Sequence, residues 1–353
     1  MSFPCKSYSK DELAVYFASR PGETKVGATI GTLEGPVLPS RFDELFQAGF
    51  RYVLLGVPED IGPRANYGHA GSHLGWESFL RVFLSMPVTE FFPQEQLVLL
   101  GEVLVDDLMR EAAGEDLLPE KLRMLCSQLD TRIEQVVTPI VKAGLVPIVI
   151  GGGHNNAYPL LRSLFQGADS AIIDRGVACV NCDPHSDFRR LEGRHSGNGF
   201  RYAYEDGFLK YYHVFGLREQ ANAVEVMRSL SDAGFSYSSW ESLVVRRECT
   251  FQEALSRLIS TVPSELTLGL EVDLDAIRGM PSSAEAPYGF SVEEVATFVH
   301  RCAKELNVSY LHLAEGAPPL NADKGRRCVG KALSLLVKTF VKAREVQQSG
   351  VKQ

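Results

Sequence analysis

Three side chains that bind metals well occupy alternate positions near the middle of the chain: Asp183, His185 and Asp187. The apolar run 176–180 comes just before them and predicts a short buried strand. In an extended chain, residues i, i+2 and i+4 point to one face, so two carboxylates and an imidazole would converge where the strand ends. That density of charge is costly unless a cation neutralises it. The alternative interpretation is a polar strand exit that faces water.

Two further clusters favour the metal site. His154 follows the apolar run 145–150, and Asp273 and Asp275 follow the run 266–272. The carboxyl edge of an open parallel sheet is where ligands bind, and all three clusters are expected there. Carboxylates and imidazoles suit Mn²⁺ and similar divalent ions. Four carboxylates exceed the need of one ion and fit two ions that share bridging carboxylates and a water.

Apolar runs that predict strands alternate with helical periodicity along the chain. The strands are expected over 52–57, 97–105, 145–150, 176–180, 211–216, 266–272 and 308–314. The helices are expected over 40–48, 76–84, 120–143, 158–165, 221–233, 251–260, 291–305 and 331–343, with a weaker one over 11–19. This alternation predicts an α/β fold, one parallel sheet with helices on both faces. No composition break marks a linker, so residues 1–353 are expected to form one domain, with an N-terminal extension over about 1–25 and a frayed tail over about 345–353.

Local signals place some element ends. Gly144 is expected to end the helix before it, and Ser40 and Ser291 are expected as helix caps. Glu294 stands three residues after Ser291, the spacing of a capping box. The strand over 97–105 is expected to end at the acidic pair 106–107.

Composition limits the class of protein and its compartment. The net charge of -8 over 353 residues argues against a nucleic-acid partner. Residues 1–10 are polar, and no apolar run approaches the ~20 residues that span a bilayer, so we expect a cytoplasmic protein with no membrane partner. The 7 cysteines are scattered. Cys179 and Cys182 have the spacing of a redox or zinc motif, but buried packing is favoured because no second such pair accompanies them.

The clusters in combination resemble the ureohydrolase superfamily of arginases, agmatinases and formimidoylglutamases, over roughly 52–343. The motifs that carry the resemblance are Gly-Gly-x-His at 151–154, Asp-x-His-x-Asp at 183–187 and Asp-x-Asp at 273–275. The resemblance implies a three-layer arginase-like fold and two Mn²⁺ ions per chain. It also implies assembly into homotrimers or hexamers.

The resemblance assigns a role to each metal-binding residue. Two bridge both ions (Asp183, Asp273), two complete the shell of one ion (His154, Asp187), and two complete that of the other (His185, Asp275). One departure concerns the reaction: Phe200 stands where arginases carry a histidine thought to shuttle protons. Arginase activity itself is therefore disfavoured.

The loop 188–199 carries the candidate substrate contacts. Arg189 stands where arginases have a neutral asparagine that touches the substrate carboxylate, and a guanidinium there favours a more anionic substrate. Ser196 and Asn198 are further candidate substrate contacts. Arg190 and Arg194 are as readily explained by a solvated charged loop. N-formimino-L-glutamate has two carboxylates, and the loop over 58–66 also resembles formimidoylglutamases most.

Glu315 closes the last predicted strand. In the family a glutamate at this place holds the cationic amidine or guanidine; the alternative is a strand-end glutamate that faces water. The expected reaction is hydrolysis of the amidine C–N bond of N-formimino-L-glutamate to L-glutamate and formamide, a step of histidine degradation. Asp187, beside the activated water, is the expected proton carrier.

Two other functions remain open from the sequence. A guanidino hydrolase such as agmatinase would release urea, although the arginine-rich loop should repel cationic agmatine. A catalytically silent scaffold is the other alternative. The complete set of ligands argues against it, because a scaffold has no need to cluster like charges.

Overall fold

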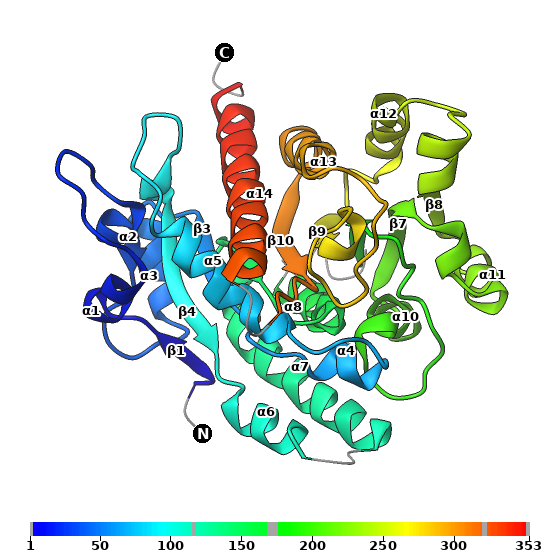
Figure 1. The fold of residues 1–353 in the computed structure, drawn as a ribbon, viewed down its shortest axis with the longest axis horizontal. Helices are drawn as coiled ribbons and strands as arrows, with labels where there is room; N and C mark the ends of the chain where they lie inside the picture. The colour runs from blue at the N-terminus through cyan, green and yellow to red at the C-terminus, as the bar shows by residue number, and fades with distance from the viewer. Residues whose placement is uncertain (1–2, 115–117, 168–175, 320–322, 351–353) are drawn as a thin grey trace.

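The computed structural model describes residues 3–114, 118–167, 176–319 and 323–350. Their strands form a ten-stranded sheet in the order β1-β4-β3-β5-β10-β9-β6-β7-β8, with β2 beside β4 (Figure 1). The strands are β1 Cys5–Ser7, β2 Gly31–Thr32, β3 Tyr52–Gly56, β4 Leu97–Val103, β5 Val146–Ile150, β6 Val177–Cys182, β7 Leu209–Leu217, β8 Ser236–Ser239, β9 Thr267–Asp273 and β10 Val308–Ala314.

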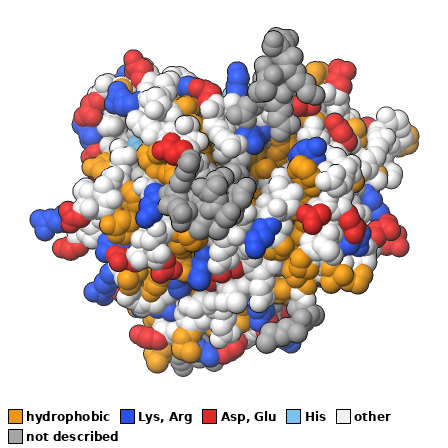
Figure 2. All heavy atoms as spheres, turned by 180° about the vertical axis from the view of Figure 1, so that it is seen from behind, with side chains coloured by type: hydrophobic (Ala, Val, Ile, Leu, Met, Phe, Trp, Pro, Cys, Tyr) orange, Lys and Arg blue, Asp and Glu red, His pale blue; other side chains and the backbone are white. Residues whose placement is uncertain are grey.

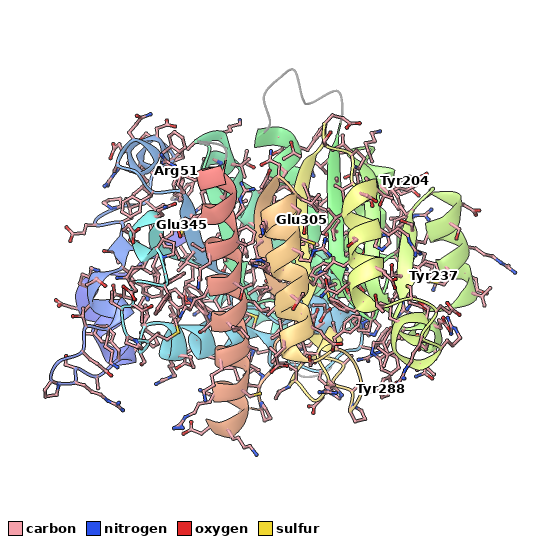
Figure 3. All side chains as sticks on the ribbon, turned by 90° about the horizontal axis from the view of Figure 1, so that it is seen from above. Arg51, Tyr204, Tyr237, Tyr288, Glu305 and Glu345 are labelled. Atoms are coloured by element: carbon pink, nitrogen blue, oxygen red, sulfur yellow. The ribbon has the colours of Figure 1, made fainter. Side chains whose placement is uncertain are left out.

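Helices cover both faces of this sheet. They are α1 Lys10–Leu13, α2 Val26–Thr29, α3 Arg41–Gln47, α4 Ile61–Ala65, α5 Gly75–Phe83, α6 Asp106–Ala112, α7 Pro119–Lys142, α8 Ala157–Gly167, α10 Gly199–Glu205, α11 Val224–Asp232, α12 Phe251–Thr261, α13 Val292–Glu305 and α14 Asp323–Gly350. Figure 3 shows α14, α13 and α12 side by side over one face. The opposite face packs against α7 and α8.

Two apolar cores, one on each face, hold the three layers together. Strand β3 contributes Tyr52 and Leu54 to one core and Val53 and Leu55 to the other. A strand buried on both faces needs an uninterrupted apolar run, which is the pattern that the sequence shows. The predicted three-layer α/β fold is thus confirmed.

The order of the parallel strands positions the site. Strands β5, β10, β9 and β6 are consecutive neighbours and run parallel. Their carboxyl ends therefore lie on one edge of the sheet. His154, Asp183 and Glu315 follow the ends of β5, β6 and β10, and Asp273 is the last residue of β9.

The N-terminal region and the acidic pair differ from expectation. Residues 5–7, inside the expected extension, form β1 and pair antiparallel with β4, so the sheet is not wholly parallel. Strand β4 ends at Val103, and Asp106 and Asp107 begin α6 instead. Acidic groups are favourable in the first turn of a helix, and Asp107 Oδ2 also accepts a hydrogen bond from Arg132 at 2.6 Å.

The last helix is longer than predicted. It begins at Asp323 rather than at 331 and continues through the first residues of the expected frayed tail, of which 351–353 lie outside the described residues. A glycine is unfavourable inside a helix, so Gly330 argues against a helix in the sequence. In the structure a Cβ at this position would lie 2.2 Å from the Ser78 carbonyl oxygen of α5. Glycine is needed because the two helices pack closely.

The expected helix ends are mostly confirmed. Gly144 has φ of 79° and its amide bonds the Val141 carbonyl at 2.9 Å. The Ser291 hydroxyl accepts from the Glu294 amide at 3.1 Å, and the Glu294 carboxylate accepts from the Ser291 amide at 2.7 Å, a complete capping box. The prediction for Ser40 is wrong in detail, because its backbone is already helical and its side chain makes no capping bond. The weak helix over 11–19 is confined to α1 and a 3₁₀ turn, Ala14–Tyr16.

The surface carries charges of both signs. On the face in Figure 2, lysine and arginine side chains are interspersed with aspartate and glutamate. Among the described helices, none combines the length and the apolar character that crossing a membrane requires.

His213 makes stability depend on pH. It is buried in β7 between the hydroxyls of Ser236 and Ser238, at 2.8 and 3.1 Å. Burial lowers its pKa from 6.5 to about 4, so the unfolded chain binds the proton first as pH falls. The buried neutral imidazole therefore contributes to the free energy of unfolding above pH 6.5, and this contribution is lost as the pH falls toward 4.

We therefore predict that metal-free protein loses ~2 kcal/mol more unfolding free energy between pH 7 and pH 5 than does the variant His213→Gln. Urea unfolding at both pH values, with chelator present, measures this difference. Equal losses in the two proteins would show that the imidazole does not remain neutral in the fold.

Candidate metal centre

The turn that carries His154 leaves β5 through glycines. Gly151 and Gly152 have positive φ angles of 86° and 74°, which glycine adopts without strain. A Cβ on Gly152 would lie 2.2 Å from the side-chain amide of Asn156, so this tight turn also excludes a larger residue. The His154 amide then donates to Glu315 Oε1 at 2.6 Å. This bond ties the end of β5 to the end of β10.

His154 presents Nδ1 to three carboxylates. Nδ1 lies 3.0 Å from Asp183 Oδ2, 2.9 Å from Asp187 Oδ2 and 3.3 Å from Asp273 Oδ2. All four side chains are buried. Nδ1 has no hydrogen-bond partner in the described part of the chain. A buried imidazole nitrogen surrounded by carboxylates is the arrangement of a metal ligand set.

A second group adjoins the first. Ligand atoms of His185, Asp273 and Asp275 lie within 4.8 Å of one another. His185 Nδ1 is 3.5 Å from Asp183 Oδ1 and 3.7 Å from Asp275 Oδ2. Asp273 thus belongs to both groups, and Asp183 lies between the two imidazoles. The structure brings together all six residues that the sequence analysis selected as metal ligands.

The carboxylates are aimed by turns rather than by a strand. Strand β6 ends at Cys182, and Asp187 has φ of 44°, so the extended chain expected through this motif is wrong. Instead, Asp183 Oδ1 accepts from the amide two residues later at 2.7 Å, and Asp273 Oδ1 does the same with the Asp275 amide at 2.7 Å. Each turn leaves the second carboxylate oxygen to point into the cluster.

The negative charge of the cluster is complementary to bound cations. Burial, together with the charges of Asp275 and Asp183, raises the pKa of Asp273 well above its ordinary value. Four clustered carboxylates in a buried site repel one another unless positive charge lies between them. Two divalent ions supply charge equal and opposite to that of the four carboxylates. The residues therefore fit a centre of two metal ions.

A cavity of about 300 Å³ opens onto this cluster. Its lining includes His185, Asp187, Asp273, Asp275 and Glu315, together with Asn66, Tyr67, Arg189, Ser196 and Ser283, among others. The loop over 58–75, which includes α4, contributes Asn66 and Tyr67. The volume suits a small-molecule substrate.

Glu315 lies at the inner wall of this cavity. It is buried, and its Oε2 has no hydrogen-bond partner in the described part of the chain. Burial and the charge of Asp275 raise its pKa to about 8. Its φ of 65° is rare for a side chain other than glycine. The strain is offset by the bond from Glu315 N to the Gly152 carbonyl oxygen at 3.0 Å.

The residues of the loop 188–199 fall into two groups. Arg189 and Ser196 line the cavity, and Asn66 Nδ2 donates to Ser196 Oγ at 3.3 Å. Asn198 does not line it: its side chain bonds Arg194 and the Gly193 carbonyl oxygen. The structure therefore gives Asn198 an internal role, rather than the direct substrate contact that the sequence analysis expects.

The other arginines are engaged elsewhere. Arg194 is buried and bonds Asp130 of α7 at 2.8 Å and the Asn155 carbonyl oxygen at 2.7 Å. It anchors the loop beside the turn of His154. Arg190 is exposed and bonds Glu192 at 2.8 Å.

Two residues beside the metal cluster, Glu59 and Asn181, are not predicted from the sequence. Glu59 is buried after β3, and its carboxylate accepts from the Gly153 amide at 2.7 Å and from the Ile61 amide at 2.6 Å, which fastens the loop over 58–75 to the metal turn. Asn181 donates to Asp183 Oδ2 at 3.0 Å. The one signal for Glu59 in the sequence is an acidic residue placed just after an apolar run. Its partner Gly153 follows a different strand, so the sequence does not show that the two residues meet.

The cysteine pair and Phe200 also have plain structural roles. Cys179 and Cys182 are buried and carry free thiols, in agreement with the packing interpretation. Phe200 is buried with its ring edge-on to His154, centroids 5.3 Å apart, and stacks on Tyr212 at 4.3 Å. It holds the imidazole from one side.

A model of the arginase family matches residues 50–339. The chain belongs to the arginase family. Among curated relatives, it is 26% identical over 305 residues to the formimidoylglutamase of Hahella chejuensis, covering 82% of this chain and 87% of that one. It is 24% identical over 278 residues to the formimidoylglutamase of Chromobacterium violaceum, covering 77% and 82%.

Solved structures show the same fold. The formiminoglutamase of Trypanosoma cruzi with two Mn²⁺ ions aligns at a TM-score of 0.69 and 19% identity, covering 90% of this chain and 99% of that one. The formimidoylglutamase of Bacillus subtilis aligns at a TM-score of 0.70 and 16% identity, covering 93% and 94%. The predicted arginase-like fold is confirmed by these neighbours.

The carboxylate of Asp183, which lies between the two imidazoles, yields a prediction about metal content and stability. Asp183→Asn removes one charge from the cluster, so Mn²⁺-loaded protein should keep at most one ion per chain after desalting. With Mn²⁺ the variant should melt lower than the wild type, because ion binding stabilises the folded wild type.

Elemental analysis and thermal melts measure both effects. The matched control is Asp107→Asn, an exposed carboxylate on α6 that pairs with Arg132; it should keep the wild-type metal content. Two retained ions in Asp183→Asn would contradict the bridging role.

Proposed function

We propose that the chain hydrolyses N-formimino-L-glutamate to L-glutamate and formamide, with two Mn²⁺ ions per chain. The observation that carries the proposal is a single cavity whose lining includes carboxylates of the metal cluster, Glu315 and the guanidinium-bearing Arg189. The cavity thus offers negative groups to a cationic amidine and a guanidinium to a carboxylate. The named relatives, which are formimidoylglutamases, support the same substrate.

Two Mn²⁺ ions held by the six ligands would supply positive charge and lower the pKa of a water, so that hydroxide is available near neutral pH. Asp183 and Asp273 would hold both ions, His154 and Asp187 one of them, and His185 and Asp275 the other. The Mn²⁺-bound relative from Trypanosoma cruzi supports this choice of metal.

Glu315 and Arg189 orient the substrate between them. The free Oε2 of Glu315 accepts a charge-assisted hydrogen bond from the protonated amidine. Arg189 has an exposed side chain whose guanidinium makes no hydrogen bond or ion pair within the described ranges, so it is available to a carboxylate. Its fork of donors matches a carboxylate in two parallel bonds. Ser196 Oγ, beside Asn66, is a further polar contact for that end.

The reaction exchanges one C–N bond for a C–O bond. Oxygen from water adds to the formimidoyl carbon, and the bond from that carbon to the glutamate nitrogen breaks. Asp187 lines the cavity and transfers the proton that the departing nitrogen needs. Phe200 cannot carry a proton, so no residue at its position substitutes for Asp187.

We also propose a cytoplasmic location. All 7 cysteines carry free thiols, which suits a reducing compartment. Assembly into homotrimers or hexamers stays a prediction from the family resemblance.

A product assay tests the function. Mn²⁺-loaded protein is incubated with formiminoglutamate, arginine, agmatine or guanidinobutyrate, and formamide, glutamate and urea are measured. We expect formamide and glutamate from formiminoglutamate alone. Urea from a guanidino compound would favour the guanidino hydrolase, and no product from any substrate would favour the silent scaffold.

Arg189→Ala tests the substrate choice. Removal of one partner of a charge pair that binding desolvates costs about 2–5 kcal/mol. Since 1.4 kcal/mol corresponds to about tenfold, kcat/KM for formiminoglutamate should fall at least tenfold. Metal content should not change, and Arg189→Lys should recover only part of the loss.

The matched control is Arg190→Ala. Arg190 is the next residue of the loop, is more than four-fifths exposed and pairs with Glu192. Its removal should leave kcat/KM within about twofold. Equal losses in both variants would mean that the loop acts through its general charge rather than through Arg189.

A further inference from the structure

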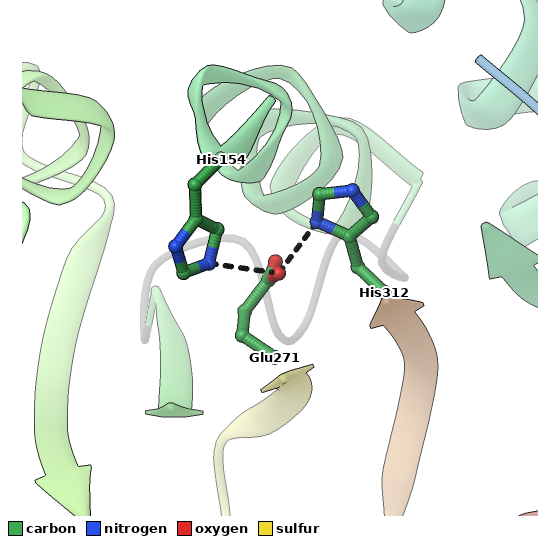
Figure 4. Close-up of side chains that lie close together, drawn as sticks. All are labelled: His154, Glu271 and His312. Atoms are coloured by element: carbon green, nitrogen blue, oxygen red, sulfur yellow. Dashed lines mark hydrogen bonds and ion pairs between the residues drawn. The ribbon is translucent and has the colours of Figure 1, made fainter. Parts of the chain in front are cut away.

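A second buried cluster lies behind His154, on the side away from the carboxylates. It consists of Glu271 in β9 and Tyr310 and His312 in β10, all wholly buried. Figure 4 shows Glu271 and His312 beside His154. Glu271 and His312 are direct partners in the register of the two parallel strands. His154 Nε2 faces Glu271 Oε2 at 3.4 Å, while its Nδ1 faces the metal cluster. The imidazole thus has an acidic group on each side.

Glu271 is held by two hydrogen bonds of its own. Tyr310 Oη donates to its Oε1 at 2.5 Å, and His312 Nδ1 bonds its Oε2 at 2.6 Å. His312 Nε2 in turn lies 3.3 Å from the Gly151 carbonyl oxygen, at the root of the turn that carries His154. A buried carboxylate with this many partners has a fixed position, because rotation would leave several polar groups unpaired.

The chain makes room for this arrangement at Gly269. A Cβ there would lie 2.5 Å from the ring of Tyr310, so a larger residue would push the phenol away from Glu271. Phe200 closes the opposite flank of His154, at an interplanar angle of 88°.

Glu271, His312 and His154 are close enough to be considered as a third metal site. Their geometry argues against it. Both oxygens of Glu271 are already engaged in hydrogen bonds, and the 2.6 Å between His312 Nδ1 and Glu271 Oε2 is the distance of a short, direct hydrogen bond. A cation there would have to break the bond between His312 and Glu271 in a wholly buried space.

We propose that Glu271 is a positioning residue that sets the metal affinity of the site containing His154. A histidine that gives its Nδ1 lone pair to a metal carries its proton on Nε2, and that buried N–H needs an acceptor. Glu271 supplies the acceptor and its negative charge makes the imidazole a stronger ligand. Tyr310 and His312 act by holding the carboxylate in place.

This inference rests on the metal centre of the proposed function, but it concerns metal binding and not the substrate. A titration with Mn²⁺ alone therefore tests it even if the substrate is another amidine. The electron paramagnetic resonance signal of free Mn²⁺, followed during the titration, gives the number of bound ions and their affinities.

Glu271→Gln keeps the shape of the side chain and removes its charge. Partners of metal-bound histidines typically change metal affinity 10–100-fold when they are mutated. We expect one of two Mn²⁺ ions to bind about 10–100-fold more weakly and the other, at His185 and Asp275, to bind as in the wild type. Wild-type affinity for both ions would overturn the proposal.

Tyr310→Phe is a second test that does not depend on whether Glu271→Gln folds normally. It removes one bond to Glu271 and leaves the charge, so the same ion should weaken by less, by about two- to tenfold. The matched control is His213→Gln, which alters another buried imidazole of the sheet that contacts two serines instead of the metal cluster. Its Mn²⁺ titration should equal that of the wild type, and weakening of the same ion there would overturn a specific role for Glu271.

Steady-state kinetics separate positioning from a general structural role. For Glu271→Gln, the loss of kcat should disappear as Mn²⁺ is raised to saturation, with KM for formiminoglutamate unchanged. A loss of kcat that persists at saturating Mn²⁺ would overturn the proposal, since it would place Glu271 in the chemistry or in the fold rather than in metal affinity.

Discussion

The mutual repulsion of buried carboxylates is the constraint on which the rest of the site depends. Asp183, Asp187, Asp273 and Asp275 are all buried near one another, an arrangement that apolar burial alone would never stabilise. The apolar cores on the two faces of the sheet supply the free energy that holds these groups in place. Cations between the carboxylates replace this repulsion with attraction, so positive charge is favourable at this edge of the sheet.

Neighbouring elements meet that constraint in different ways. The carboxylates of Asp183 and Asp273 are fixed by bonds to the amides two residues later, and the turn of His154 is fixed by Glu59 and Glu315. The first two bonds lie within turns at the ends of parallel strands, and the last two connect segments that follow different strands. The lining of the cavity beside them includes carboxylates of the cluster and Arg189, and under the proposed function this combination suits a substrate that carries both a cation and a carboxylate.

The sequence predicts much of this, because its signals are local. The run of apolar residues before each motif marks a strand, and a polar motif after a strand marks the carboxyl edge, so the six ligands and Glu315 could be placed on one edge. What the sequence lacks is strand order. The partners of Glu271 and Glu59 come from strands that are neighbours only in the folded sheet, and both glutamates are hidden by full burial. Asn198 is predicted from the sequence as a substrate contact, yet its side chain accepts a hydrogen bond from Arg194 inside the loop.

Anomalous diffraction from Mn²⁺-soaked crystals, at the manganese absorption edge, tests the central claim most directly. The account predicts two peaks about 3.5–4 Å apart. Both should contact Asp183 and Asp273, with His154 beside one peak and His185 beside the other. A single peak in this cluster, or a peak between Glu271 and His312, would contradict it.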